Sequence, residues 1–164
     1  MSETVIRVGI ADMKIVQAPN KIRTLGLGSC VGVIIYDPNK KMAGMAHIML
    51  PDSSLAKRNK AMNVAKFADT AIKALTKELI TLGANRSNLK AKISGGAQMF
   101  QFSSKNEQMR IGPRNVEAVK KELQKLNIQL ISEDTGGNSG RTIEFNPDSL
   151  ALQINTVYQD QVVI

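Results

Sequence analysis

The stretch Val31-Gly-Val-Ile-Ile-Tyr-Asp-Pro-Asn-Lys-Lys-Met-Ala-Gly-Met-Ala-His-Ile-Met-Leu50 decides the fold, because two long apolar runs enclose one polar turn. The first run, Val31 to Tyr36, is rich in β-branched residues and is typical of a buried strand. Asp37-Pro38-Asn39-Lys40 carries strong turn chemistry. The second run, Met42 to Leu50, ends at Pro51. The pattern therefore predicts a β-hairpin.

Shorter apolar patterns on both sides of the hairpin predict further strands, at residues 4–11, 22–28, 90–94, 128–132, 141–145 and 150–157. Between them the period changes to that of a helix. One apolar stripe consists of Ala68, Ile72, Leu75, Leu79 and Leu82, with Gly83 as the C-terminal cap. A second stripe begins near Pro113 and consists of Val116, Val119, Leu123 and Leu126. Many strands and two long helices predict a single α+β domain over residues 1–164.

Composition restricts the class of protein. The chain has 164 residues, of which 43% are apolar and 22% charged, as is usual for one globular domain. It has one cysteine, so an internal disulfide is impossible and a reducing compartment is expected. Charged residues interrupt the first twenty positions, which differ in this from a signal peptide, and no apolar run approaches the ~20 residues that span a bilayer. We expect a cytoplasmic protein without membrane insertion.

The chain is basic, with 22 Lys and Arg against 14 Asp and Glu and a net charge of +8. Much of this charge lies at residues 57, 58 and 60 and at residues 120, 121 and 125. Solvated helix faces are commonly rich in lysine, but a basic surface also favours acidic partners. Aromatic residues make up 4% and tryptophan is absent, so stacking platforms for nucleic acid are hard to build. We expect no nucleic-acid partner.

Cysteine catalysis requires a thiol and a nearby base, and this chain has one cysteine and one histidine, Cys30 and His47. If residues 37–40 form a four-residue loop, Tyr36 faces Lys41, and Cys30 then stands directly opposite His47 on one face of the hairpin. A slip of one residue would send them to opposite faces. The alternative is that both are inert: a lone cysteine is often a small buried hydrophobe, and a lone histidine in an apolar run is often a core residue.

The approach to the cysteine, Thr24-Leu-Gly-Leu-Gly-Ser-Cys30, favours the catalytic interpretation. Its two glycines permit close approach of a substrate to the backbone. The backbone N–H groups of Ser29, Cys30 and Val31 are candidates for stabilising a developing oxyanion. The hydroxyl of Thr24 is a candidate acceptor for the second imidazole nitrogen of His47, which would orient the ring.

Other motif-like strings give weaker evidence of a function. Gly26-Leu-Gly28 with Gly32 is followed by a strand, whereas a dinucleotide fingerprint requires a helix there. Asp134-Thr135-Gly136 occurs once, but an aspartic protease needs two such copies. Ser94-Gly95-Gly96 lacks the lysine of a phosphate-binding loop. One histidine, one cysteine and scattered carboxylates give no ligand spacing, so we expect no metal site.

Several strings together resemble the CheD family, the chemoreceptor glutamine deamidases. The matching strings are Thr24-Leu-Gly-Leu-Gly-Ser-Cys30, Ala46-His-Ile-Met-Leu-Pro-Asp52, Phe67-Ala-Asp-Thr-Ala71, Lys92-Ile-Ser-Gly-Gly-Ala97 with Met99-Phe100, Ile111-Gly-Pro-Arg-Asn-Val116 and Glu133-Asp-Thr-Gly-Gly-Asn138. They extend over residues 22–146, and their combination is specific although each alone is weak.

The resemblance implies a function and a site. CheD-like enzymes convert selected glutamine side chains on the cytoplasmic helices of methyl-accepting chemoreceptors to glutamate, releasing ammonia, through a cysteine thioester and without metal or cofactor. The catalytic cysteine, histidine and threonine of the family fall on Cys30, His47 and Thr24. The resemblance also implies a β-sandwich-like core flanked by helices, as in deamidating toxin domains, and the phosphatase CheC as a partner. The alternatives are a catalytically silent binding module and a hydrolase of receptor methyl esters.

Overall fold

The computed structural model describes residues 3–56, 62–98 and 110–164. Within these residues, ten strands form two five-stranded sheets, and two long helices lie on one side of them. The inner sheet has the order β2-β5-β4-β6-β7, with β2 Met13–Gln17, β5 Met42–Ile48, β4 Val31–Asp37, β6 Lys90–Gly95 and β7 Gln129–Thr135. The outer sheet has the order β1-β3-β8-β9-β10, with β1 Val5–Val8, β3 Lys21–Leu27, β8 Arg141–Phe145, β9 Leu152–Thr156 and β10 Val162–Val163.

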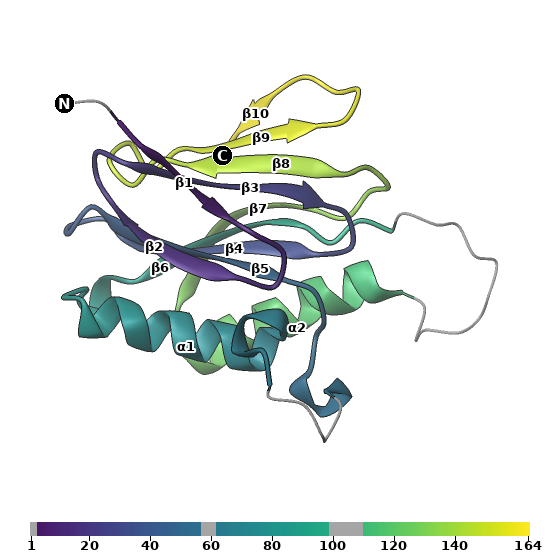
Figure 1. The fold of residues 1–164 in the computed structure, drawn as a ribbon, viewed down its shortest axis with the longest axis horizontal. Coiled ribbons are helices and arrows are strands. Elements are labelled where there is room, and N and C mark those ends of the chain that lie inside the picture. The colour runs from purple at the N-terminus through teal and green to yellow at the C-terminus, as the bar shows by residue number, and fades with distance from the viewer. Residues whose placement is uncertain (1–2, 57–61, 99–109) are drawn as a thin grey trace.

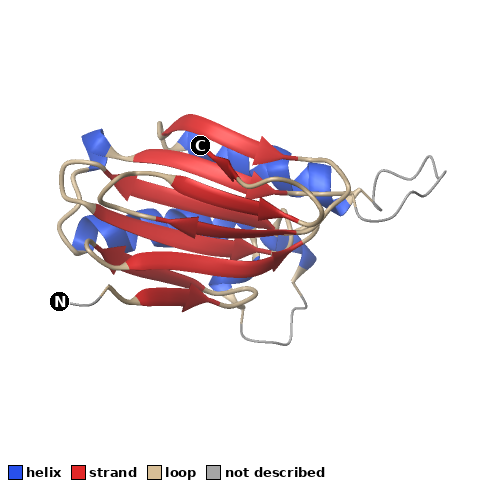
Figure 2. Ribbon diagram, turned by 90° about the horizontal axis from the view of Figure 1, so that it is seen from above, coloured by secondary structure: helices blue, strands red, loops and turns tan. Residues whose placement is uncertain are grey.

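The molecule has three layers: outer sheet, inner sheet and helices (Figure 1). The helices α1 (Ala68–Thr81) and α2 (Ile111–Lys125) cover the face of the inner sheet that points away from the outer sheet, so the view onto the outer sheet shows strands in front of helices (Figure 2). Three short 3-10 helices, Ser53–Leu55, Val64–Lys66 and Arg86–Asn88, lie in the connections among the described residues. The predicted α+β fold with a sandwich-like core is confirmed.

Strand β4 is the centre of the fold because both of its faces are covered. Val31, Val33 and Ile35 pack in the cluster beneath the helices, whereas Ile34 and Tyr36 pack between the two sheets. Every residue of β4 and of β5 is buried. This explains why the two runs are continuously apolar rather than alternating, as is usual for strands that are covered on both sides.

The predicted hairpin forms, but its register differs from the prediction. Asp37 pairs with Met42 and Gly32 pairs with His47, so the loop is shifted along the chain and Cys30 is not directly opposite His47. Hydrogen bonds hold Asp37 at the end of the strand, because its carboxylate accepts from the N–H groups of Asn39 and Asn85. The predicted direct opposition is therefore wrong. Because the shift amounts to two residues rather than one, the two side chains still belong to the same face.

Most other predicted elements are present, with changes at their ends. Helix α2 begins at Ile111, two residues before the predicted start. Leu82, expected on the apolar stripe of α1, follows the helix and is 55% exposed. Strands β2 and β10 were not predicted. The basic residues 57, 58 and 60 and the pair Met99-Phe100 lie outside the described residues. No helix in the described ranges is long and apolar enough to cross a membrane.

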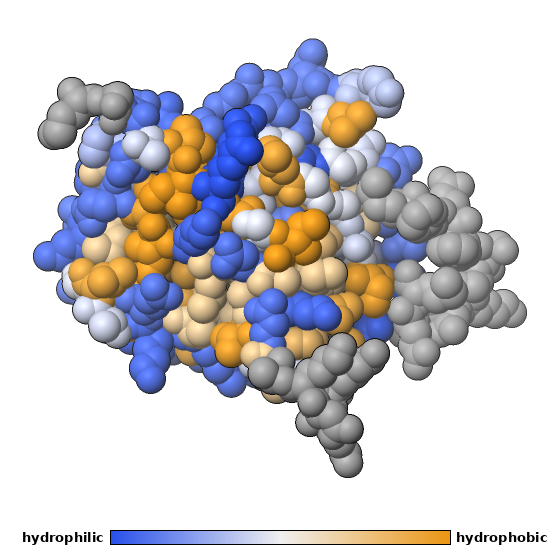
Figure 3. Space-filling view, in the orientation of Figure 1, coloured by the Kyte–Doolittle hydropathy of each residue, from blue (hydrophilic) through white to orange (hydrophobic). Residues whose placement is uncertain are grey.

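The surface is mixed in character. Figure 3 shows hydrophobic residues interspersed with hydrophilic ones on the face in view. Two exposed hydrophobic residues are Leu25, which follows Thr24 on β3 and is 46% exposed, and Ile10, which lies two residues after β1 and is 61% exposed. Of the three lysines expected to form a basic face on α2, Lys120 pairs with Glu133 at 2.9 Å and Lys125 pairs with Glu122 at 3.2 Å. Part of that positive charge is thus neutralised locally.

Candidate active site

Thr24 and His47 meet in the space between the two sheets. Thr24 lies on β3 of the outer sheet and is 1% exposed, and His47 lies on β5 of the inner sheet and is fully buried. The Oγ1 atom of Thr24 lies 2.7 Å from Nδ1 of His47 and 2.8 Å from the carbonyl oxygen of Val8. The contact expected between the threonine hydroxyl and the imidazole is present.

This pair of contacts assigns the histidine tautomer. A threonine hydroxyl has one proton to donate, and a carbonyl oxygen only accepts. The hydroxyl of Thr24 therefore donates to Val8 and accepts from Nδ1–H of His47. Nε2 of His47 then has a free lone pair, and this atom is buried without a hydrogen-bond partner among the described residues. Burial also lowers the pKa of His47, which favours the neutral ring. The imidazole is thus prepared to act as a base.

Cys30 lies just before β4, at the same end of the sheets as His47. Since Gly32 is the partner of His47, Cys30 is diagonal to His47 on the same face of the inner sheet, with Cβ atoms expected ~7–8 Å apart. The side chain of Cys30 packs against the cluster between the sheets, on the side where His47 meets Thr24. It is a free, partly exposed thiol. The structure therefore brings Thr24, His47 and Cys30 to one region.

The electrostatics of Cys30 favour the neutral thiol at rest. Burial raises the pKa of Cys30, while the N–H group of the same residue lowers it to a smaller extent. With the pKa of Cys30 raised and that of His47 lowered, the resting pair consists of a neutral thiol and a neutral imidazole. An arrangement of this kind needs the imidazole to remove the thiol proton during attack.

The backbone of residues 28–30, next to the thiol, is fixed by hydrogen bonds to its carbonyl oxygens. The carbonyl oxygens of Gly28, Ser29 and Cys30 accept hydrogen bonds from Ala97 N–H, Asn115 Nδ2 and Gly96 N–H at 2.9, 2.9 and 2.8 Å. In the described part of the chain, the N–H groups of Ser29 and Cys30 donate to no backbone carbonyl. Val31 is already inside the sheet, between Ile48 and Gly95. Among the three oxyanion candidates, the geometry favours Ser29 and Cys30.

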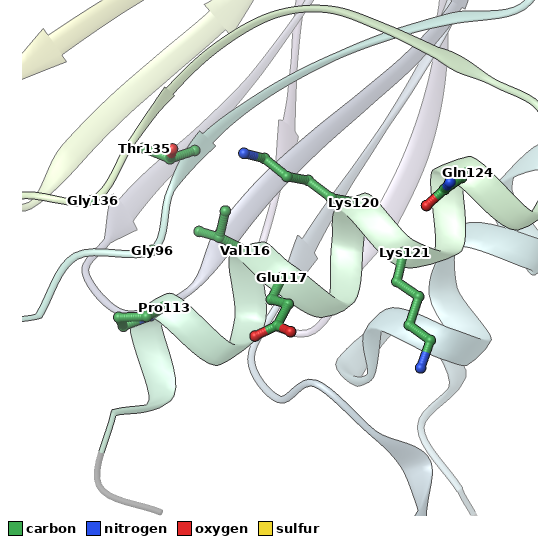
Figure 4. A pocket seen from close by; sticks show the side chains of 9 residues that line it. All are labelled: Gly96, Pro113, Val116, Glu117, Lys120, Lys121, Gln124, Thr135 and Gly136. Carbon is green, nitrogen blue, oxygen red and sulfur yellow. The ribbon is translucent and has the colours of Figure 1, made fainter. Parts of the chain in front are cut away.

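A groove of about 760 Å³ lies close to the backbone of Cys30 but on the opposite side of the inner sheet. Figure 4 shows its lining, in which Val116 and Lys120 of α2 point toward the segment of Thr135 and Gly136, whereas Glu117 and Lys121 point away from it. Gly96 contributes to this lining and also donates its N–H to the carbonyl of Cys30. The Cys30 side chain, by contrast, packs between the sheets. The groove is therefore separated from the thiol by the backbone.

Asn115 is a buried residue that the sequence analysis did not single out. It is fully buried on α2 and contacts both the loop of Cys30 and the chain after His47. The sequence contains one signal for it: Asn115 lies four positions before Val119, so the two residues share one face of the helix. Val119 is also fully buried, which makes this the packed face. No group of three His, Cys, Asp or Glu side chains able to hold a metal ion occurs among the residues described.

Comparison with known proteins shows which family this chain is similar to. The model of the family described as CheD chemotactic sensory transduction matches residues 49–156. A chemoreceptor glutamine deamidase CheD from Halalkalibacterium halodurans is 59% identical over 96% of this chain and 96% of its own length. The protein of that name from Bacillus subtilis is 55% identical over 98% of this chain and 96% of its own. These alignments are long enough to include Thr24, Cys30 and His47, which precede the region matched by the family model.

Among solved structures, the hypothetical protein YfiH of Bacillus licheniformis aligns with a TM-score of 0.49 and 15% identity over 77% of this chain and 51% of that chain. The family assignment depends on the sequence relatives, whose identity is high over nearly the whole chain. On this evidence, the chain belongs to the CheD family.

Proposed function

We propose that this chain is a chemoreceptor glutamine deamidase that acts in chemotaxis, hydrolysing glutamine side chains of methyl-accepting receptors to glutamate and ammonia. The observation that carries the proposal is the oriented imidazole: Thr24 fixes His47 so that an unpartnered Nε2 lies on the face to which Cys30 belongs. Relatives more than 50% identical are named for this activity. The same chemistry occurs on several unrelated folds, so the site, rather than the fold, supports the proposal.

The first half of the reaction forms a thioester. Sγ of Cys30 attacks the side-chain amide carbon of the substrate glutamine as Nε2 of His47 takes the thiol proton. The negative charge that develops on the amide oxygen is stabilised by the N–H groups of Ser29 and Cys30. The imidazolium then gives its proton to the leaving nitrogen, the C–N bond breaks and ammonia departs. The glutamyl side chain remains bonded to Sγ.

The second half consumes one water molecule. Nε2 of His47, again neutral, removes a proton from water as the oxygen attacks the thioester carbon. The C–S bond breaks, the thiolate of Cys30 recovers its proton from the imidazolium, and a glutamate side chain is released. Thr24 holds Nδ1–H in both halves, so the same nitrogen exchanges every proton. The steps proceed with the residues of this chain and water.

The substrate explains two features of the surface. Receptor helices that carry modifiable glutamines also carry many glutamates, so a protein of net charge +8 attracts them at long range. The exposed side chains of Ile10, two residues after β1, and of Leu25, on the outer face of β3, are available for apolar contacts with a receptor helix. We place the reaction in the cytoplasm, where these receptor helices lie. We also expect the phosphatase CheC to be a partner.

The test is incubation of the purified protein with a cytoplasmic receptor fragment, followed by mass spectrometry of its peptides. The proposal expects glutamine positions to gain the mass difference between an amide and a carboxylic acid, and expects Cys30→Ala to abolish that gain. A fragment prepared with methylated glutamates distinguishes deamidation from ester hydrolysis. Wild-type protein that binds the fragment without altering it would instead establish the silent binding module.

A further inference from the structure

Asn115 of α2 joins the two segments that carry the nucleophile and the base. Its Nδ2 donates to the carbonyl oxygen of Ser29 at 2.9 Å and to that of Met49 at 2.9 Å. Ser29 immediately precedes Cys30, and Met49 lies two residues after His47. One side-chain amide nitrogen thus bonds to both segments, and the residue is fully buried.

Two glycines bring the helix close enough for this contact. A Cβ atom on Gly112, in the first turn of α2, would clash with the carbonyl oxygens of Gly96 and Ala97. Gly96 itself has a φ of +68° and donates its N–H to the carbonyl of Cys30. The start of α2 therefore lies directly on the segment that holds the nucleophile loop. Asn115, one turn further along, is then placed between the ends of β4 and β5.

The two contacts require two protons on one side-chain group, while Oδ1 of Asn115 is buried without a hydrogen-bond partner among the described residues. Both protons of Nδ2 are used, one for each carbonyl, so a single planar group sets the separation of the two segments. A serine or threonine hydroxyl has one proton to donate, and an ionised aspartate has none. Asn115 is fully buried and both hydrogen bonds are partly buried, so they resist displacement by water more than they would at the surface.

We propose that Asn115 is a positioning residue of the reaction, which holds the Cys30 loop at a fixed distance from the strand of His47 without touching substrate. The inference rests on the proposed function, since it assigns the residue a part in that reaction. A displacement of 1 Å in such a pair costs about 10²-fold in rate. Loss of the two hydrogen bonds is therefore expected to lower kcat by about this factor, with KM changed much less, because receptor binding does not involve this residue.

The test uses two variants and one control. Asn115→Ala removes the amide, and Asn115→Asp keeps the volume but removes both donated protons. Val119→Ala is the matched control, because Val119 is equally buried one turn further along α2 and packs in the cluster under the inner sheet. For each protein, kcat and KM are measured on a receptor fragment, and the alkylation rate of Cys30 by iodoacetamide is measured on the free protein near neutral pH.

The two readouts are expected to move in opposite directions. In both Asn115 variants deamidation slows, while alkylation accelerates because the released loop exposes the thiol. In Val119→Ala, which loses only packing, kcat per folded molecule and alkylation stay at the wild-type level. Folded Asn115 variants with wild-type kcat, or equal losses in Asn115→Ala and Val119→Ala, would overturn the inference. If the wild type itself fails to deamidate, the proposed function fails, and unchanged alkylation in Asn115→Ala still refutes the positioning role separately.

Discussion

The hydroxyl of Thr24 can be removed with almost no change in side-chain shape by the substitution Thr24→Val. In the structure this hydroxyl accepts from Nδ1 of His47 and donates to the carbonyl of Val8, and both Thr24 and His47 are buried. The substitution leaves the buried Nδ1–H of His47 without an acceptor, at about 1–3 kcal/mol, whereas the carbonyl of Val8 remains in the ladder between β1 and β3. We therefore expect the free energy of unfolding to fall by about 1–3 kcal/mol.

The effect on catalysis is separate and larger. Without the acceptor at Nδ1, the ring is free to move its proton to Nε2 or to rotate, and either change removes the base from the thiol. We expect kcat to fall by about 10²-fold, the cost of a misplaced catalytic group. Stability is measured by urea unfolding, and kcat is measured on a receptor fragment by mass spectrometry under conditions in which every variant is folded.

Thr24→Ser is the matched control, because it keeps the hydroxyl and loses only a methyl group. It should retain most of the activity, whereas Thr24→Val should not. A Thr24→Val protein that is folded and turns over as fast as Thr24→Ser would refute the reasoning, since it would show that the hydrogen bond to Nδ1 has no part in the reaction.

Three further predictions follow from the same contacts. Burial lowers the pKa of His47 in the folded protein, so below the ordinary histidine pKa of about 6.5 the unfolded chain binds more protons than the folded one. The free energy of unfolding therefore falls as the pH decreases through that region. Because the chain has one histidine, His47→Asn should remove this pH dependence in urea titrations. The deamidation rate should fall on the acid side only below about pH 6.5, because the neutral ring of His47 is the base. A midpoint above that value in the pH profile of the rate would contradict the lowered pKa of His47. Gly112→Ala should lower the melting temperature despite the better helix propensity of alanine, because its Cβ meets backbone oxygens, whereas Gly9→Ala, with open space around it, should not.

The local elements of the fold were predictable because their patterns are long. The two runs of the hairpin and the stripes of α1 and α2 each extend over enough residues for one period to dominate. Strand β10 has two residues, which is too short for a periodic signal, and in β2 only Val16 is buried, so its apolar pattern is weak. Leu82 has the spacing of a core residue but follows the last turn of α1, so it points to solvent.

The sequence was sufficient to nominate the residues of the candidate site and the contact between Thr24 and His47, but not the register that separates Cys30 from His47. A single cysteine and a single histidine leave one pairing, and the face they share depends only on the parity of the register. The register itself depends on Asp37, whose carboxylate is bound by N–H groups from its own turn and from Asn85, a contact across 48 positions in the chain. The role of Asn115 likewise depends on two carbonyls distant in sequence. Such contacts become visible only when the chain is folded.

The central claim is that Cys30, activated by His47, becomes covalently bonded to the substrate glutamine. The most direct measurement is to mix the protein with a receptor fragment, quench with acid within the first turnover and determine the mass of the intact protein. The account predicts an adduct on Cys30 with the mass of the fragment less ammonia, absent from Cys30→Ala and removed by hydroxylamine. Deamidated fragment released by Cys30→Ala at the wild-type rate would contradict it.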